Sequence, residues 1–346
     1  MTAACLRVDL GRMLADIDTV RARIFPAQLM VVVKNDAYGH GVDRVVAEAA
    51  AHGVEWFGAF DVPTGVRARA AAGPGARIFS WVTIGPDEIA TALGARIELG
   101  VGDAGYLEDV AAVSAGGRAA VHLKVDTGLH RNGIRPEDWD AVVARAVELE
   151  ARGDIRVVGV WSHIAETSDE SDDAARGIFL AAVESARAAG LRPDVLHLAA
   201  SAAGYARAEF RHDLVRIGAF CYGIRSTGGP DLDGIVPAAT LIAPVTRVEG
   251  ETVEVAYGSL DGLPSTLSGR VTVGTPGGAR ALLAVADTTL TVAGWPGARV
   301  GDEVAVFGPG ELGESSATTL AEAIGTVGEE IIVRVSPLVP RVYAHA

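Results

Sequence analysis

The sequence is poor in several kinds of residue that mark particular classes of protein. It has only two cysteines, Cys5 and Cys221, far apart and without metal-ligand spacing. That excludes a disulfide framework and indicates a reducing compartment. No apolar run reaches the roughly 18 residues of a membrane-spanning helix, and the first residues lack the apolar stretch of a secretion signal. These absences predict a cytoplasmic protein with no membrane partner.

Positive charge is also scarce. The formal net charge is −14, and because a protein that binds nucleic acid needs a basic face, nucleic-acid binding is excluded. The chain has only two lysines, Lys34 and Lys124, and each ends an apolar run typical of a buried strand. Lysines used for solubility would be scattered over the surface. Their placement at two strand ends therefore indicates function.

What the sequence does contain is a repeated alternation of apolar strands and alanine-rich helices. Strand candidates lie at 29–34, 56–60, 77–81, 97–101, 120–125, 157–162, 195–200 and 214–218. Helical patterns lie between most of them, at 43–52, 63–72, 86–93, 104–115, 137–152 and 173–190. The alternation predicts an α/β protein with an N-terminal (β/α)8 TIM-like barrel over residues 11–226. A doubly wound open sheet has the same alternation, and periodicity alone does not decide between the two.

The pattern changes after Ser226. A linker rich in Gly, Asp and Pro (226–235) leads into short alternating stretches separated by turn residues. Strands are expected at 239–248, 252–257, 269–273, 280–285, 289–293, 303–307 and 331–335, with one short helix at 320–324. This predicts a smaller all-β C-terminal domain of residues 236–346, joined by the N-terminal strand within residues 1–10.

Reactive side chains gather at the ends of the predicted barrel strands, where barrel enzymes carry their active sites. They are Lys34, Lys124, Arg131, His163, Ser201 and Arg216. Burial at a strand end lowers the pKa of a lysine, as an imine-forming lysine requires. Each residue alone has an ordinary structural explanation, such as a core histidine or a helix N-cap. Together, cations, hydroxyls and glycine amides predict a site for a phosphate-bearing cofactor that forms an imine with lysine.

Five segments, in order and spacing, resemble the alanine racemase family: VVVKNDAYGHG, HLKVDTGLHRNGI, SHIAETSDE, HLAASAA and LVRIGAFCYGI. The resemblance is strong from about residue 5 to 225 and weak beyond. Those enzymes are fold-type III pyridoxal 5′-phosphate proteins with an N-terminal barrel and a C-terminal β domain. The resemblance therefore implies this cofactor and interconversion of L- and D-alanine, or of another small amino acid, by two-base proton transfer.

The resemblance also implies a role for each matching residue. Lys34 binds the cofactor as an imine and is one of the two acid/base groups, Arg131 binds the substrate carboxylate, and Lys124 orients that arginine. The other cofactor contacts are Tyr38, Ser201, Gly218 and Ala219 at the phosphate, and His163 and Arg216 at the pyridine ring.

The second acid/base group implied is Tyr257, in the segment Val255-Ala256-Tyr257-Gly258. In the family this tyrosine comes from the partner subunit, so the resemblance implies a head-to-tail homodimer. In this chain Asp261-Gly262 follows almost at once, where the family carries a second tyrosine motif further on. Tyr257 is therefore either the catalytic tyrosine or the remnant of the other.

Other functions are open at this stage. The chain could be a pyridoxal phosphate enzyme of the same fold with one-face chemistry, or with another amino acid as substrate. It could also be a non-catalytic protein that binds the cofactor. A barrel metal enzyme using His163, Glu166 and Asp169 would need those residues on one helical face, and no helix is predicted there. We therefore expect no metal.

Overall fold

The computed structural model describes residues 3–198 and 201–345, so Ala199 and Ala200 of the HLAASAA segment lie outside the described residues. The chain divides into two compact units. Val20–Lys34 and Val42–Gly218 form what we call the barrel unit. The sheet unit takes the chain up to Thr19, the short segment Asn35–Gly41, and the chain from Ala219 onward.

The barrel unit is built on eight parallel strands in the order β8-β7-β6-β5-β4-β3-β2-β9. Their bounds are β2 Gln28–Val32, β3 Trp56–Asp61, β4 Arg77–Val82, β5 Ile97–Val101, β6 Ala119–Lys124, β7 Ile155–Trp161, β8 Val195–His197 and β9 Leu214–Ile217. The two end strands are joined through Asp213, whose N–H donates to Leu196 O at 3.2 Å and whose carboxylate accepts from Leu196 N at 2.9 Å. The sheet thus closes, and the predicted (β/α)8 barrel is confirmed.

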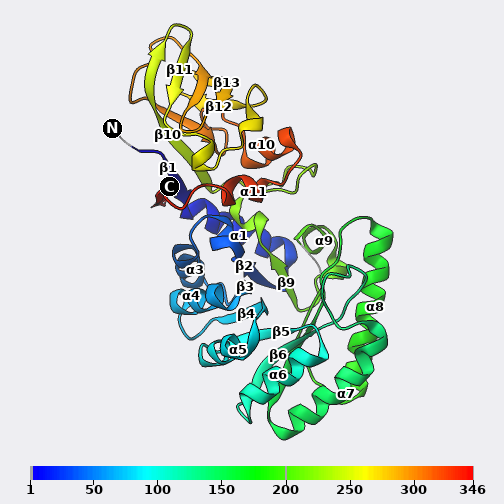
Figure 1. Cartoon of the computed structure of the whole chain (residues 1–346). Coiled ribbons are helices and arrows are strands. Elements are labelled where there is room, and N and C mark those ends of the chain that lie inside the picture. Colours follow the sequence, from blue (N-terminus) through cyan, green and yellow to red (C-terminus); the bar gives the residue numbers. More distant parts are fainter. Residues whose placement is uncertain (1–2, 199–200, 346) are drawn as a thin grey trace. The chain divides into compact units, whose positions relative to one another are not determined.

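Helices lie outside these strands, as Figure 1 shows. They are α3 Val42–Ala51, α4 Val62–Ala72, α5 Gly85–Gly94, α6 Ala104–Ser114, α7 Pro136–Arg152 and α8 Asp169–Ala188, with the short α9 Ser201–Ala206 and η1 Ala208–Phe210 before β9. Helix α8 begins four residues before the predicted start at 173. The Ser168 side chain accepts a hydrogen bond from Ser171 N, and Asp169 and Glu170 favour the helix N-terminus.

The inside of the barrel contains a cluster of large apolar side chains contributed by several strands. One cluster of buried residues consists of Met30, Trp56, Phe79, Trp161, Val195 and Leu214, against which Trp81 packs. Successive residues of a strand point to opposite faces, so one residue in two reaches this interior. At the carboxyl ends of the strands the interior residues are polar instead, and these form the site described below.

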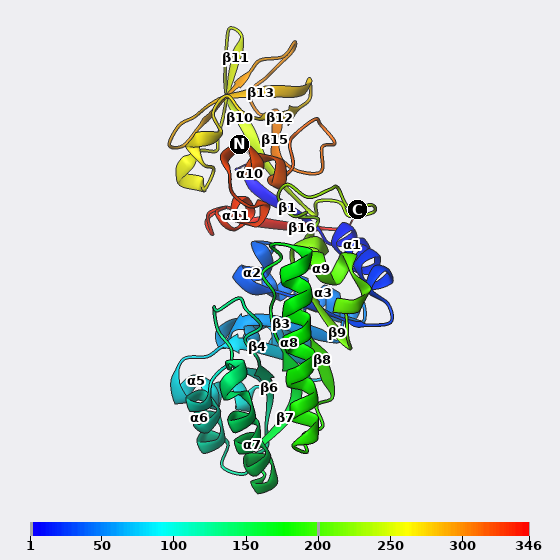
Figure 2. The same ribbon diagram turned by 90° about the vertical axis from the view of Figure 1, so that its right-hand side faces the viewer.

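The sheet unit contains a sheet in the order β11-β14-β13-β12-β15-β10-β1-β16, with β11 also paired to β10. Its pairs are antiparallel except for β1 with β16, which run parallel. The bounds are β1 Cys5–Asp9, β10 Ala239–Glu249, β11 Thr252–Val255, β12 Thr272–Thr275, β13 Gly278–Val285, β14 Leu290–Ala293, β15 Glu303–Phe307 and β16 Arg341–Ala344. The long β10 pairs with β1, β11 and β15 along its length, so β10 to β15 close on themselves. Figure 2 shows these strands with helices α10 and α11 beside them.

The helices of the sheet unit were only partly predicted. Helix α10 Ala317–Ile324 covers the expected helix, but α11 Gly328–Val333 occupies the stretch 331–335 where a strand was expected, so that prediction is wrong. Glu329 and Glu330 stand in the first turn of α11 and favour its N-terminus. Strand β16 was not predicted. Helix α1 Leu10–Ile24 runs from one unit into the other, and short helical turns η2 Ala219–Tyr222, η3 Ser259–Asp261 and η4 Ser265–Leu267 complete the chain.

Candidate functional site

Cationic side chains meet at the carboxyl ends of the barrel strands. Lys34 follows β2 and is half-buried, Lys124 is the last residue of β6, and Arg216 lies in β9. Lys124 Nζ is 4.9 Å from the ring centroid of Trp161, and Arg216 Cζ is 5.0 Å from the same centroid. An indole ring attracts both cations. Trp161 therefore holds two positive groups close together in a place from which water is largely excluded.

Burial and like charge reduce the tendency of Lys124 to carry a proton. The side chain is almost completely buried. Burial lowers the pKa of its amine to about 8, with the positive charges of Arg131 and Arg216 acting in the same direction. An amine with such a pKa is neutral in part of the molecules near neutral pH.

His163, from the loop after β7, is close to all the cations of the site. Burial lowers its pKa to about 3, helped by the charges of four cations, Arg216, Arg131, Lys124 and Lys34. All four are near enough to one imidazole to act on it, so the structure brings these five predicted residues together. The ring stays neutral, which leaves the positive charge of the site to its lysines and arginines.

Arg216 is held in one position by its neighbours. Its Nη2 donates to Ser162 O at 2.7 Å and lies 3.5 Å from His163 Nδ1, while its Nη1 donates to His197 Nδ1 at 2.8 Å and to His197 O at 3.1 Å. Burial lowers the pKa of the guanidinium to about 9, so it keeps its charge at neutral pH. His197 was not among the predicted site residues, although it lies in one of the quoted segments.

The remaining predicted residues fall into two groups. In the barrel unit, Gly218 N donates to Ser201 Oγ at 3.5 Å, so these two lie together. Tyr38, Ala219 and Tyr257 belong to the sheet unit. Arg131 is exposed on the loop after β6. The barrel mouth thus carries Lys34, Lys124, Arg131, His163, Ser201, Arg216 and Gly218.

An unusual backbone conformation follows Lys34. Asn35, Asp36, Ala37 and Tyr38 all have φ between 53° and 55°, which makes one left-handed turn. The turn costs roughly 1–2 kcal/mol for each residue with a Cβ, so it needs support. Within the sheet unit His40 supplies some, because its buried Nδ1 lies 3.0 Å from both Ala37 O and Tyr38 O. The sequence contained no sign of this turn beyond Asn35 and Asp36, the types that tolerate it best.

Tyr257 is buried in the sheet unit. Its hydroxyl donates to the backbone oxygen of Asp261 at 2.9 Å, and only 1% of the residue is exposed. Burial, with the nearby charge of Asp261, raises its pKa well above the ordinary value. For Tyr257 to exchange a proton with a substrate, this hydrogen bond has to open.

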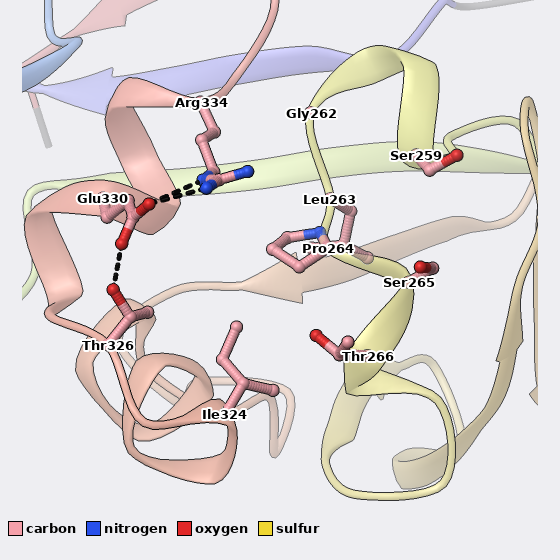
Figure 3. Close-up of a pocket in the computed structure, with 10 residues that line it drawn as sticks. All are labelled: Ser259, Gly262, Leu263, Pro264, Ser265, Thr266, Ile324, Thr326, Glu330 and Arg334. Carbon is pink, nitrogen blue, oxygen red and sulfur yellow. Dashed lines mark hydrogen bonds and ion pairs between the residues drawn. The ribbon is translucent and has the colours of Figure 1, made fainter.

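A polar pocket lies in the sheet unit between the segment after Tyr257 and helix α11 (Figure 3). It is lined by Ser259, Gly262, Leu263, Pro264, Ser265, Thr266, Ile324, Thr326, Glu330 and Arg334. Its arginine, Arg334, is paired with Glu330 at 2.6 Å. With its positive charge balanced in this way, the pocket is a poorer site for an anion than the barrel mouth.

No group of three or more His, Cys, Asp or Glu side chains in residues 3–198 and 201–345 is arranged to hold a metal ion. Glu166, one of the three residues of the metal hypothesis, binds the backbone instead: its Oε1 accepts a hydrogen bond from Ala203 N at 2.6 Å. In the same described ranges no helix is both long and apolar enough to cross a membrane.

The fold and the site together define a class: a (β/α)8-barrel protein with a cationic, lysine-containing mouth and a second unit built on a β-sheet. Comparison with known families gives the particular one. Residues 8–226 match the N-terminal domain of alanine racemase and residues 244–343 match its C-terminal domain. The chain belongs to the alanine racemase family, and the predicted family and fold are confirmed. Alanine racemases are pyridoxal 5′-phosphate-dependent isomerases.

Individual relatives agree along the whole chain. The alanine racemase of Thermobifida fusca is 36% identical, with 98% of each chain covered, and that of Beutenbergia cavernae is 36% identical over 97% of this chain and 96% of its own. The crystal structure of alanine racemase from D-cycloserine-producing Streptomyces lavendulae is similar with a TM-score of 0.93 and 33% identity, covering 100% of this chain and 98% of that one.

Proposed function

We propose that this chain is a pyridoxal 5′-phosphate-dependent amino-acid racemase that interconverts L- and D-alanine. The observation that supports it best is the group of four cations around a neutral His163 at the barrel mouth, which includes both lysines of the chain. This donor set fits the cofactor, because a phosphate and a phenolate oxygen need cations and an imine needs an amine. When bound, the cofactor supplies the electron sink that makes the α-proton of an amino acid acidic.

The residues of the chain then divide the work. Lys34 would hold the cofactor through its amine and would exchange a proton with the substrate Cα on one face. Arg131 binds the substrate carboxylate, and Lys124 orients that arginine. Ser201, Gly218, Tyr38 and Ala219 would bind the phosphate.

In this proposal Arg216 and His163 would hold the pyridine ring of the cofactor, with Arg216 at its nitrogen. A guanidinium donates hydrogen bonds and does not give up its proton at neutral pH. Arg216 would therefore leave the ring nitrogen without a proton, which would limit the electron sink and disfavour side reactions such as transamination. The buried contacts of Arg216 with Ser162 O and His197 hold the guanidinium for this task.

Tyr257 is proposed as the acid/base group on the opposite face, contributed by the partner in a head-to-tail homodimer. We further propose that the protein is cytoplasmic and that its domains comprise residues 11–226, and 1–10 with 236–346. A second function is favoured by the buried hydroxyl of Tyr257, which already donates to Asp261 O. If it stays there, the enzyme exchanges the α-proton on one face only, on alanine or another amino acid.

The experiment follows the α-proton. L-alanine and D-alanine are each incubated with the holoenzyme in D₂O, and deuterium uptake and chirality are measured. For a two-base racemase, wild type gives deuterated product of both hands, while Tyr257→Phe loses inversion by a factor of about 100 or more but still exchanges the proton of one enantiomer. Exchange without inversion in the wild type would establish the one-face alternative, and unreduced inversion in Tyr257→Phe would assign the second base to another residue.

A further inference from the structure

Behind Arg216, the interior of the barrel unit contains a continuous line of polar side chains. His197 Nδ1 contacts Arg216, and His197 Nε2 lies 2.9 Å from His122 Nδ1. His122 Nε2 in turn lies 2.7 Å from Glu98 Oε2. At the far end Arg77 donates to both oxygens of Glu98, at 2.6 and 2.8 Å. We call Arg216, His197, His122, Glu98 and Arg77 the polar relay.

The direction of every hydrogen bond in the polar relay follows from the chemistry of its two ends. Arginine only donates, so His197 Nδ1 has to be an acceptor without a proton. In a neutral ring the proton is then on Nε2, which donates to His122 Nδ1. By the same reasoning His122 carries its proton on Nε2 and donates it to Glu98, and a carboxylate only accepts. All donors thus point from the two arginines toward Glu98.

The charges of the polar relay agree with this direction. Burial lowers the pKa of both histidines, so the two rings are neutral. Burial alone would raise the pKa of Glu98, but the hydrogen bonds from His122 and Arg77 lower it to about 2. Glu98 is therefore ionised, and it is the group that requires an N–H from His122.

The surrounding residues are shaped around the polar relay. Gly159 is paired with His122 across β6 and β7. Its φ is not positive, so the backbone conformation does not require a glycine at this position. A Cβ at this position would lie 2.1 Å from His122 Nδ1, so glycine makes the room for the ring. Trp161 stacks on His197 with 5.7 Å between the ring centroids, and the ring centroids of Phe79 and His122 are 4.7 Å apart. This apolar sheath excludes water and strengthens the hydrogen bonds inside it.

We propose that Glu98, His122 and His197 are positioning residues for Arg216. Glu98 orders the tautomers of both histidines, so that a lone pair faces the guanidinium and holds it at the barrel mouth. Without the carboxylate, His122 is free to put its proton on Nδ1, which places the proton of His197 on the side of Arg216. Two donors would then face each other, and the arginine would turn away. The inference rests on the proposed function, in which Arg216 faces the pyridine nitrogen.

The first test needs no change within the polar relay and no bound cofactor. The chain has eight histidines. We predict that the side-chain ¹⁵N NMR signals of His122 and His197 are those of neutral rings with the proton on Nε2. These signals should not change between about pH 6 and pH 8, the range in which an ordinary histidine titrates. Single His→Gln variants of the other histidines assign the signals. A proton on Nδ1, or a second proton on either ring, would overturn the proposal even if racemisation is found.

The second test compares Glu98→Gln, which keeps the shape but removes the charge, with Val121→Ala, a buried control one residue before His122 on the other face of β6. Glu98→Gln is expected to shift the visible absorption of the bound cofactor and to lower kcat by about tenfold or more with little change in KM. The control should lose stability and keep both readouts. An unchanged spectrum and kcat in Glu98→Gln would refute the positioning role.

Gly159→Ala is a second variant that alters the polar relay without replacing any of its members. It keeps the test possible if Glu98→Gln does not fold. Its new methyl group displaces His122, so the same spectral change is expected. If both act through the polar relay, the double variant should be little worse than either single variant. Additive losses would contradict a common pathway. A wild-type protein that takes up no pyridoxal phosphate would instead refute the proposed function, and the NMR test would still stand.

Discussion

Lys124 and Arg216 are both buried cations of the barrel unit, and burial acts on them differently. The guanidinium of Arg216 stays charged, because even a pKa lowered to about 9 is above neutral pH. The amine of Lys124, with a pKa lowered to about 8, is partly neutral. The site therefore keeps a permanent positive charge at Arg216, and at Lys124 it has a charge that changes with pH near neutrality.

This difference predicts a dependence of stability on pH. The folded pKa of Lys124 is below the unfolded value, so between about pH 8 and 10.5 the unfolded chain binds more protons and the free energy of unfolding rises with pH. Relative to Lys124→Met, wild type should gain about 2 kcal/mol between pH 7.5 and 9.5. Urea unfolding in bicarbonate-free buffer measures this. A difference that does not vary with pH would mean that the amine is not desolvated.

At the scale of elements, the left-handed turn at 35–38 shows how a strained segment is kept in place. Gly39, directly after it, has φ 83°, and a Cβ there would lie 3.0 Å from Ile332 O of helix α11. Gly53 has nearly the same φ, 81°, but nothing within 4 Å of its would-be Cβ. The two glycines share a backbone conformation and differ in their surroundings.

The pair makes a matched experiment. Gly53→Ala should lower the free energy of unfolding by about 1 kcal/mol, the cost of a Cβ at positive φ. Gly39→Ala should cost about 2–4 kcal/mol, because the backbone of α11 has to move as well. Differential scanning calorimetry on both variants gives the comparison. Equal losses would show that α11 does not pack closely against Gly39.

Elements also show what the sequence could predict. The barrel strands were found because each is a short apolar run bounded by helices with strong periodicity. Residues 331–335 were misread since a short apolar stretch fits a strand and a helix equally well, and only the acidic first turn of α11 separates them. In the site, the strand-end cations were predictable. The polar relay was not, because Glu98 and His197 are 99 residues apart in sequence and meet only when the barrel closes, although His122 shares a strand face with Lys124.

At the scale of the whole molecule, the proposed head-to-tail dimer makes each active site depend on two chains. Lys34→Ala removes the group on one face of the substrate, and Tyr257→Phe removes the group on the other. Each variant alone should be inactive as a racemase. When the two are co-expressed in equal amounts, half of the dimers are mixed, and each mixed dimer has one complete site.

Racemisation should therefore return to about one quarter of the wild-type rate in the co-expressed mixture, and light scattering should give the mass of a dimer. The doubly substituted chain, co-expressed with wild type, is the control that places both losses in one chain. If the mixture of single variants stays inactive while the control does not, Tyr257 acts on the site of its own chain. If Tyr257→Phe alone keeps its activity, Tyr257 is not the second base.

The central claim is that Lys34 carries the cofactor at the mouth of the barrel, and the scarcity of lysine makes it directly measurable. Borohydride reduction of the holoenzyme fixes the cofactor to its lysine, and peptide mass spectrometry then has only Lys34 and Lys124 to distinguish. The account predicts a pyridoxyl group on Lys34 alone and none in Lys34→Ala. A label on Lys124, or protein that carries no label after incubation with pyridoxal phosphate, would contradict it.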